Sequence, residues 1–447
     1  MTSSTLLGRR LTALRLERAR TAQLEPHIRT PAAPRADFAQ LAVERARRLA
    51  VAVEGELIQT GSGRYVRIEP SGTDVPLDRV RLAVLPGAPP AHVPLVCLDT
   101  ETTGLATGPG TVAFLIGVGT WSGGRFQQLQ LLLPDHADEA ALLDALSDAI
   151  PAEAWLVTYN GRSFDWPLLV ARYRMAGRAA PAHVGHLDLL PLVRRVFRHR
   201  LTDARLRTVE TELLHLDRGP DVDGWEIPGR YLSCLRGGPA DPLVEVVRHN
   251  HEDVRSLARL LAHAERSLGA LADRRAAPRG DLTGLAHAYR RIGRFEEALA
   301  CIEAALEARS PAQPARYSWT ALLTARADAP DSAHDTHDTR DTRPALLLER
   351  ARLLRRVGRH EDALAAWRDL AAGGGPVAGV AWVEIAKTLE HRRRDPAAAL
   401  DACSAAGRIA QRARWLGRPL VEIEADLVRR RRRLVGRMTR AGSSGAG

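Results

Sequence analysis

The chain of 447 residues is too long for one ordinary domain and predicts two or three. Its four cysteines form no C-x-x-C pair, and no apolar run approaches the ~20 residues that span a bilayer, which argues against a zinc site, a disulfide framework and a membrane span. The formal net charge of +11 favours polyanionic partners such as nucleic acid, although one lysine among 64 basic residues is a skew that a GC-rich genome also produces.

Aromatic residues make up 4% of the chain, so its core must consist mostly of Leu, Val and Ala, which favours a helix-rich or α/β architecture. The first 20 residues lack the apolar segment of a signal peptide, and the scattered cysteines suit a reducing compartment. We therefore expect a cytoplasmic protein.

The N-terminal region is predicted to be an extension that precedes the first domain. Residues 1–50 are Arg-rich and helical in pattern, and the segment 64–69 (RYVRIE) alternates with the period of a strand. The proline-rich segment 86–94 (PGAPPAHVP) reads as a boundary. This predicts a helical and β extension over residues 1–90 and a separate domain over residues 91–268.

Beyond that boundary the pattern predicts an α/β fold with a mixed sheet flanked by helices. The first strand is a short apolar run, and Gly123 and Gly124 form the turn between the next two strands. Pro242 lies at the start of the last helix, where a proline is tolerated. The expected strands cover 95–98, 112–121, 126–133 and 155–159, and the expected helices cover 139–150, 166–175 and 241–268.

The first motif is the segment 98–105 (LDTETTGL), at the end of a predicted strand. Asp99 and Glu101 are two residues apart, so both carboxylates point to the same face of the strand. Two carboxylates at such a short distance repel each other unless a cation lies between them. Carboxylate oxygens are hard ligands, which suit magnesium or manganese. On the D-x-E pair alone, however, surface acids at a strand end are the favoured interpretation.

The second motif is the segment 159–167 (YNGRSFDWP), at a strand-to-helix junction. Asn160 and Gly161 close the strand, and Asp165 enters the helix. Taken alone, Asp165 is best interpreted as the N-cap of that helix.

The third motif is the segment 248–257 (RHNHEDVRSL), inside the last predicted helix. His249 and Asp253 are four residues apart and share a helical face, so His249 could act as a general base beside Asp253. Asp253 lies near the apolar side of the helix, where an acid needs a partner, and a metal is one candidate. The alternative is a surface ion pair worth a few tenths of a kcal/mol. His251 is expected to point away from this face.

The three motifs occur in the order and approximate spacing of the DEDD exonucleases, and the chain resembles that superfamily. Within it, the chain is most similar to the YprB-like group of ribonuclease-H-like proteins. The resemblance covers residues 93–265 and includes GTVAFLIGVG (110–119), HLDLLPLVRRVFRHRL (186–201) and RLRTVETELL (205–214).

This resemblance implies a ribonuclease-H-like fold and a metal-dependent 3′→5′ exonuclease, in which two Mg²⁺ or Mn²⁺ ions serve phosphodiester hydrolysis. The metal ligands that it implies are Asp99, Glu101, Asp165 and Asp253. His249 is the expected base, but it departs from the family pattern. Members with a tyrosine in the third motif place it four residues before the last aspartate, and members with a histidine place it five before, where this chain has Arg248.

Further contacts with a nucleic-acid substrate are expected near these motifs. Thr100 and Thr102 are predicted to position the substrate through backbone contacts, and Asn160 to orient a metal ligand or the substrate 3′ end. Residues 172–207 carry nine arginines and two acids, which form either a phosphate track, the interpretation favoured in a nuclease, or a solvated helical face.

The C-terminal region contains an internal repeat. After an expected linker (269–283), GRFEEALA (293–300) recurs as GRHEDALA (358–365), with a weaker copy at 394–400 (RDPAAAL). The 65-residue offset is close to twice the ~34-residue period of tetratricopeptide repeats. We therefore expect tetratricopeptide-like helical repeats over residues 280–426, with a degenerate unit at 317–327. Such a module would dock a protein partner or extend the nucleic-acid surface.

Two segments of this region allow two interpretations each. The segment 327–343 contains HDTHDTRDT, which suits a disordered insertion better than a metal site. The expected basic tail, 427–447, contains five consecutive arginines that either contact nucleic acid or form a solvated helix end. The alternative to the enzyme is a non-catalytic nucleic-acid-binding protein, or an adaptor or scaffold that acts through its repeats.

Overall fold

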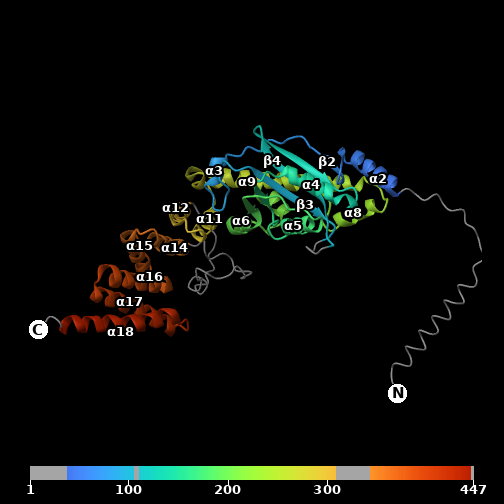
Figure 1. Cartoon of the computed structure of the whole chain (residues 1–447). Coiled ribbons are helices and arrows are strands. Elements are labelled where there is room, and N and C mark those ends of the chain that lie inside the picture. Colours follow the sequence, from blue (N-terminus) through green and yellow to red (C-terminus); the bar gives the residue numbers. More distant parts are fainter. Residues whose placement is uncertain (1–37, 105–109, 309–342, 444–447) are drawn as a thin grey trace, which may run out of the picture.

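The computed structural model describes residues 38–104, 110–308 and 343–443 (Figure 1). The expected helical pattern over residues 1–37, Leu105 of the first motif, the degenerate unit at 317–327 and residues 327–342 of the expected insertion lie outside the described residues.

A seven-stranded mixed sheet forms the centre of the N-terminal half, with the strand order β1-β2-β5-β4-β3-β6-β7. Strands β3, β6 and β7 are parallel to one another, and the remaining neighbours are antiparallel. The strands are β1 (Glu56–Thr60), β2 (Gly63–Ile68), β3 (Leu95–Thr102), β4 (Ala113–Ser122), β5 (Arg125–Leu132), β6 (Trp155–Thr158) and β7 (Gly185–Asp188). The predicted mixed sheet is confirmed, and β7 is an addition to it.

Helices cover both faces of the sheet (Figure 1). On one face, Cys97 of β3 shares a buried cluster with Val254 and Leu257 of the long helix. On the other face, Leu98 shares a cluster with Leu142. The helices of this half are α2 (Phe38–Ala52), α3 (Arg79–Ala83), α4 (Glu139–Ala149), α5 (Asp165–Met175), α6 (Leu189–Val196), α7 (Leu206–Thr208) continued by η3 (Val209–Leu213), α8 (Ile227–Leu235) and α9 (Pro242–Leu268).

The N-terminal hairpin belongs to the central sheet, so the expected boundary at residue 90 needs correction. Strand β2 pairs with β5, with Val66 opposite Leu132 and Ile68 opposite Gln130. Val66 is fully buried there. Without the hairpin, β5 would be an edge strand with unpaired backbone N–H and C=O groups and an uncovered apolar surface. The hairpin pairs these backbone groups and covers the apolar surface. The proline-rich segment is a connection within the domain.

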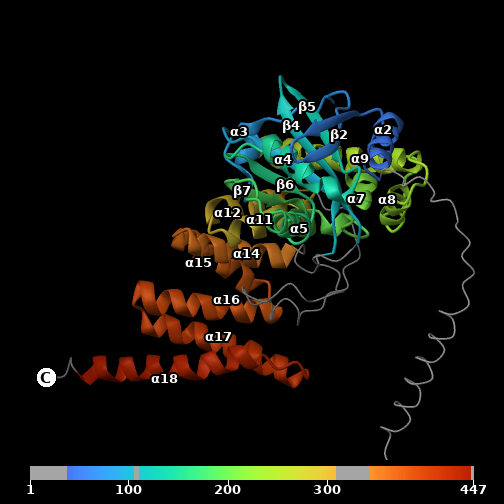
Figure 2. The same ribbon diagram turned by 45° about the vertical axis from the view of Figure 1, so that its right-hand side comes forward.

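Consecutive helices of the C-terminal half pack against one another in an array (Figure 2). They are α10 (Leu271–Arg274), α11 (Arg279–Arg291), α12 (Phe295–Glu307), α14 (Arg343–Arg356), α15 (His360–Ala372), α16 (Gly375–Thr388), α17 (Pro396–Trp415) and α18 (Val421–Ser443). No helix in the described ranges combines the length and the apolar composition that a bilayer crossing requires.

The two matching octapeptides form equivalent turns between helices. Gly293 and Gly358 both have a positive φ, 79° and 84°, which glycine adopts without steric cost. The residue after each glycine donates its N–H across the turn, from Arg294 to the Tyr289 carbonyl at 3.0 Å and from Arg359 to the Leu354 carbonyl at 2.9 Å. The repeat therefore encodes recurring helical hairpins, while their tetratricopeptide character stays a prediction.

The ends of the array differ from expectation in two ways. Residues 269–283 are not an open linker: a Cβ on Gly284 of α11 would lie 2.7 Å from Val196 Cα of α6, so the array packs directly on the sheet domain. The Tyr289 hydroxyl also donates to the Val84 carbonyl at 2.9 Å. At the other end, α18 crosses the expected start of the basic tail and buries Leu427 and Leu434, because its apolar face completes the array.

Candidate active site

Two carboxylates of the first motif lie at the end of the central strand β3. Asp99 and Glu101 share one face of the strand, the face that α9 crosses. Both side chains are largely buried, and that of Glu101 is 13% exposed. The register shifts between Glu101 and Thr102, so the strand ends at an irregularity directly after the pair.

Gly117 allows α9 to lie close over this pair. It is opposite Asp99 on β4, and a Cβ there would clash with Oδ1 of Asn250 and lie 2.6 Å from Cγ2 of Val254, both on α9. Because this position has no side chain, Asn250 reaches the strand and its Nδ2 donates to Oδ2 of Asp99 at 2.9 Å. Gly117 of the GTVAFLIGVG segment therefore has a packing role at the site.

Asp165 of the second motif is the first residue of α5 and points at the end of β3. Phe164 occupies the N-cap position, and the described residues provide no side-chain hydrogen bond that caps the helix. The Asp165 carboxylate instead accepts a hydrogen bond from the Thr100 hydroxyl at 2.5 Å, and it is 6% exposed. The capping interpretation therefore does not account for this buried aspartate.

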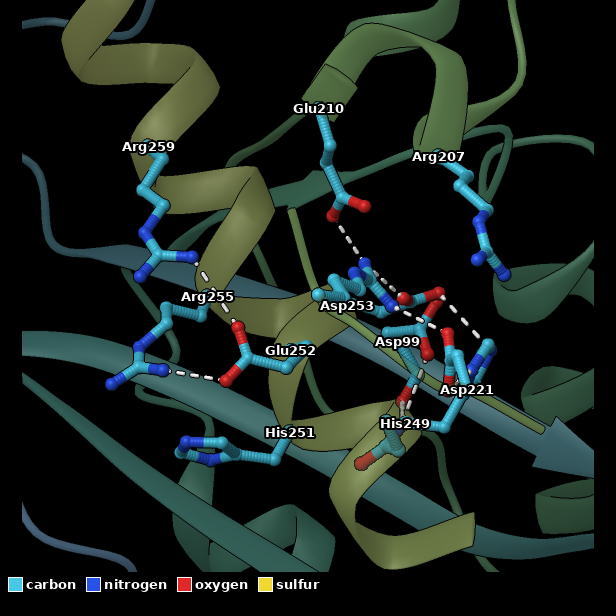
Figure 3. A network of polar contacts seen from close by, with 12 residues as sticks. Asp99, Arg207, Glu210, Asp221, His249, His251, Glu252, Asp253, Arg255 and Arg259 are labelled. Carbon is cyan, nitrogen blue, oxygen red and sulfur yellow. Dashed lines mark hydrogen bonds and ion pairs between the residues drawn. The ribbon is translucent and has the colours of Figure 1, made fainter. Parts of the chain in front are cut away.

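The third motif brings His249 and Asp253 of α9 to the same place. His249 Nε2 lies 3.8 Å from Oδ2 of Asp253 and 4.0 Å from Oε1 of Glu101. The histidine and Asp253 side chains are each 19% exposed, so the pair is not a solvated surface contact. Figure 3 shows His251 beside Glu252 and away from Asp99, as its position on the helix predicts.

Sequence reasoning missed three residues around His249 and Asp253, which are Arg218 and, as labelled in Figure 3, Glu210 and Asp221. His249 Nδ1 lies 2.9 Å from Oδ1 of Asp221. The Arg218 guanidinium contacts Oδ1 of Asp253 at 2.5 Å, Asp221 at 3.5 Å and the buried carboxylate of Glu210. Glu210 lies within the 205–214 segment that resembles the family, whereas Arg218 and Asp221 lie in an irregular loop whose sequence has no periodic signal.

The electrostatics of the cluster show an excess of negative charge. Burial, and then the neighbouring carboxylates, raise the pKa of Asp99 well above its usual value. Burial also raises the pKa of Glu101 to about 8 and that of Asp165 to about 6. Burial lowers the pKa of His249, but the nearby Asp253, Glu101 and Asp221 carboxylates outweigh it and raise the pKa overall. A divalent cation would relieve this repulsion.

The metal-binding arrangement is not preformed in full. Within the described ranges, no group of three His, Cys, Asp or Glu side chains has a geometry that could hold a metal ion without rearrangement. Asp253 is turned toward Arg218, which holds one of its two oxygens. The donor set itself fits, because buried carboxylate oxygens are the ligands that Mg²⁺ and Mn²⁺ prefer. Binding a metal would require a change in the Asp253–Arg218 contact.

The three expected substrate-contacting residues occupy different environments. The side chains of Thr100 and Thr102 are buried, and the Thr102 hydroxyl donates to the Gly104 carbonyl at 2.7 Å. Asn160 is exposed in a left-handed turn, with φ 66°. Asp188 holds that turn by accepting hydrogen bonds from the backbone N–H groups of Asn160 at 2.8 Å and Arg162 at 3.3 Å.

Several arginines of the expected phosphate track serve the fold instead. Arg172 is buried and donates to Glu139 at 2.6 Å. Arg178 contacts Asp144 at 2.5 Å, and Arg200 contacts Asp281 at 2.8 Å. Arg207, in contrast, is exposed and extends near the carboxylate cluster (Figure 3). The count of arginines over residues 172–207 therefore overstates how many of them could form a phosphate track.

The region that contains these side chains is similar to known proteins. Residues 96–265 match the RNase H superfamily. That region contains all four carboxylates and His249. The chain is also 36% identical over 176 residues to a Bacillus subtilis (strain 168) protein whose printed name is "Uncharacterized protein YprB". The aligned part is 39% of this chain and 42% of that relative, so the chain spans less than half the length of the relative. The expected ribonuclease-H-like resemblance is confirmed for this region.

Proposed function

We propose that the chain is a metal-dependent nuclease that hydrolyses phosphodiester bonds from the 3′ end of a nucleic-acid strand. The observation that supports it best is the convergence of Asp99 and Glu101 from β3, Asp165 from α5 and Asp253 from α9. These buried carboxylates repel one another, which is unfavourable for folding and favourable for cation binding. An RNase H superfamily match over the same residues supports nuclease activity.

The four carboxylates would hold Mg²⁺ or Mn²⁺, most economically as two ions. When bound, these ions supply the positive charge that stabilises a phosphodiester during hydrolysis. Asn250 orients Asp99 through its Nδ2 hydrogen bond, and Thr100 orients Asp165 through its hydroxyl. Both contacts fix carboxylates in the direction of the shared site.

His249 is the proposed general base. An ionised carboxylate only accepts, so the 2.9 Å contact with Asp221 favours a proton on Nδ1 of His249, and in the neutral imidazole the Nε2 lone pair then faces the cluster. Nε2 lies close to both Glu101 and Asp253, where an attacking water would give up its proton. The spacing that departs from the family pattern therefore still directs the imidazole into the site.

Backbone groups of Thr100 and Thr102 are proposed to position the substrate, since their side chains are engaged within the fold. The exposed Asn160 is proposed to contact the 3′ end of the strand, since the adjoining turn is held by Asp188.

A non-catalytic nucleic-acid-binding protein is the second candidate. One observation favours it: Arg218 pairs with Asp253 and places a positive charge inside the cluster without a metal. A guanidinium fixed there permanently would keep the carboxylates stable and the site inactive. The two candidates differ in whether divalent metal displaces this contact.

The test uses 5′-labelled single-stranded DNA and RNA with Mg²⁺ or Mn²⁺, beside a circular strand of the same sequence. The proposal predicts a ladder that shortens from the 3′ end of the linear strand and leaves the circle intact. Cutting of the circle would indicate an endonuclease. Binding of every substrate without hydrolysis would favour the non-catalytic candidate.

A further inference from the structure

The last helix of the array, α18, lies at the end of the molecule opposite the sheet (Figures 1 and 2). Residues 396–443, which form α17 and α18, contain eleven arginines and four acids (Asp401, Glu422, Glu424 and Asp426). The segment therefore carries seven of the eleven net positive charges of the chain. Such a concentration far from the carboxylate site calls for an explanation of its own.

The structure divides the five consecutive arginines into two groups. Arg430 is buried and Arg433 is 42% exposed, and both contact Glu390, at 2.6 and 2.7 Å, so they hold α18 on the array. Arg429, Arg431 and Arg432 are exposed. Arg431 and Arg432 have no carboxylate within ion-pair distance among the described residues, and residues 428–439 contain no acid. Arg431 and Arg432 are therefore available to an external anion, and the exposed Arg429 has only a 3.9 Å contact with Asp426 among the described residues.

We infer that this outward face of α18, defined by Arg429, Arg431 and Arg432, binds the sugar-phosphate backbone of nucleic acid. Guanidinium groups recognise phosphate oxygens independently of sequence. The inference rests on the proposed function for the choice of nucleic acid as the polyanion. A strand that reaches both α18 and the carboxylate site would be held at two points, so long strands would bind more tightly than short ones.

The exposed surface of α18 does not suit a membrane. Its apolar face is already buried against the array through Leu427 and Leu434. The apolar residues left exposed on α18 are Val421, Val428, Val435 and Met438, and the five consecutive arginines lie between Val428 and Val435. An interfacial membrane helix needs a continuous apolar face free to insert.

The experiment measures binding of a labelled 40-nucleotide single strand, DNA and RNA in turn, to the full chain in EDTA at several salt concentrations. The test variant is R431A/R432A. The matched control is R291A/R368A, which removes two exposed arginines from α11 and α15 that have no ion-pair partner among the described residues. Circular dichroism checks that both variants keep the helical content of the wild type.

R431A/R432A should weaken binding about tenfold near 0.15 M salt and make the slope of log K against log salt shallower by about 1.4, since each single-strand phosphate contact contributes about 0.7. The control should stay within about twofold of wild type. Equal losses in both variants, or no loss in the test variant, would overturn the inference. Loss of binding to phosphatidylserine vesicles with intact strand binding would also overturn it, in favour of a membrane surface.

Hydrolysis of a labelled 8-nucleotide strand, measured separately with Mn²⁺, distinguishes this inference from the proposed function. R431A/R432A should cleave that short strand like wild type, because α18, which contains Arg431 and Arg432, lies far from β3, which contains Asp99 and Glu101 (Figures 1 and 2). Absence of cleavage in wild type, together with the α18-dependent binding, would reject the nuclease and leave the binding surface standing. If R431A/R432A cleaved the short strand more slowly than wild type, that result would contradict a binding surface confined to α18.

Discussion

Oδ1 of Asp221 lies 2.9 Å from Nδ1 of His249, and this contact fixes the orientation of the imidazole inside the carboxylate cluster. Asp221 is 6% exposed in its side chain and comes from a loop rather than from one of the three motifs. It is therefore a positioning residue, which acts on the proposed reaction through His249.

Replacing Asp221 by Asn tests that role. We expect a fall of about 10- to 100-fold in kcat, the usual cost of losing an orienting partner, with little change in KM. His249→Ala should cost about 10²- to 10⁴-fold, as for loss of a general base. In the His249→Ala background, Asp221→Asn should have almost no further effect. A full additional loss in the double variant would show that Asp221 acts independently of His249.

The stability of the metal-free protein should depend on pH in a defined direction. Burial raises the pKa of Glu101 to about 8, above its usual 4.5, so the folded protein binds more protons than the unfolded chain between these values. The contribution of Glu101 to stability is therefore fully present below about pH 4.5 and is lost as the pH rises through about 8. Thermal unfolding in EDTA should show a lower Tm at pH 8.5 than at pH 5.5, and Mn²⁺ should restore the Tm mainly at the higher pH.

Glu101→Gln is the control for that measurement. The variant should unfold at a higher temperature than wild type in EDTA at pH 8.5, and it should gain less from Mn²⁺. A Tm that falls with pH equally in both proteins would assign the pH dependence to groups outside the cluster.

Gly117→Ala tests how closely α9 must approach the sheet. The added Cβ would lie 2.6 Å from Val254 Cγ2 and would clash with Asn250. Overpacking of this kind typically costs about 1–3 kcal/mol. We expect both lower stability by urea unfolding and weaker Mn²⁺ binding, because Asn250 orients Asp99. As a control, Gly61→Ala adds a Cβ with nothing within 4 Å and should leave metal binding unchanged. Normal Mn²⁺ binding by Gly117→Ala would show that metal binding does not depend on how closely α9 packs on the sheet.

The sequence allowed the mixed sheet and most residues of the candidate site to be predicted, because their signals are local. Asp99 and Glu101 follow an apolar run, and the long periodic pattern around Asp253 specifies one helix. Their juxtaposition was predicted through the family resemblance, not through any one motif. Gly117 of β4 belongs to a segment that carried the resemblance, although its packing against Asn250 is visible only in the structure.

The features that sequence reasoning missed depend on contacts between distant segments. Strand β2 joins the sheet because the edge of β5 is free, and pairing between residues 66 and 132 leaves no local mark. Arg218 and Asp221 lie in an irregular loop, where neither helical nor strand periodicity guides an assignment. The five arginines of α18 look uniform in the sequence, and Glu390 alone among their described partners distinguishes the inward pair from the outward three.

Glu390 should stabilise the end of the array at neutral pH. Hydrogen bonds from Arg433, and then from Arg430, lower the pKa of Glu390 to about 2. A lowered pKa contributes stability above about pH 4.5 that is lost as the pH falls through about 2. Glu390→Gln should therefore lower the Tm at pH 7, and the difference from wild type should shrink by pH 3. Glu361→Gln, which removes an exposed partner of Arg393, should change the Tm little. Equal effects of the two substitutions on the Tm would contradict a stabilising role for the buried contacts of Glu390 with Arg430 and Arg433.

The most direct test of the central claim compares strand cleavage by wild type, Asp99→Asn and Glu153→Gln in the presence of Mn²⁺. Glu153 is an exposed carboxylate of the same domain, so its substitution controls for a change of charge. The account predicts metal-dependent shortening of the strand by wild type and Glu153→Gln, and none above background by Asp99→Asn. Cleavage that survives in purified Asp99→Asn, or that proceeds equally in EDTA, would contradict a metal-dependent nuclease site built on these carboxylates.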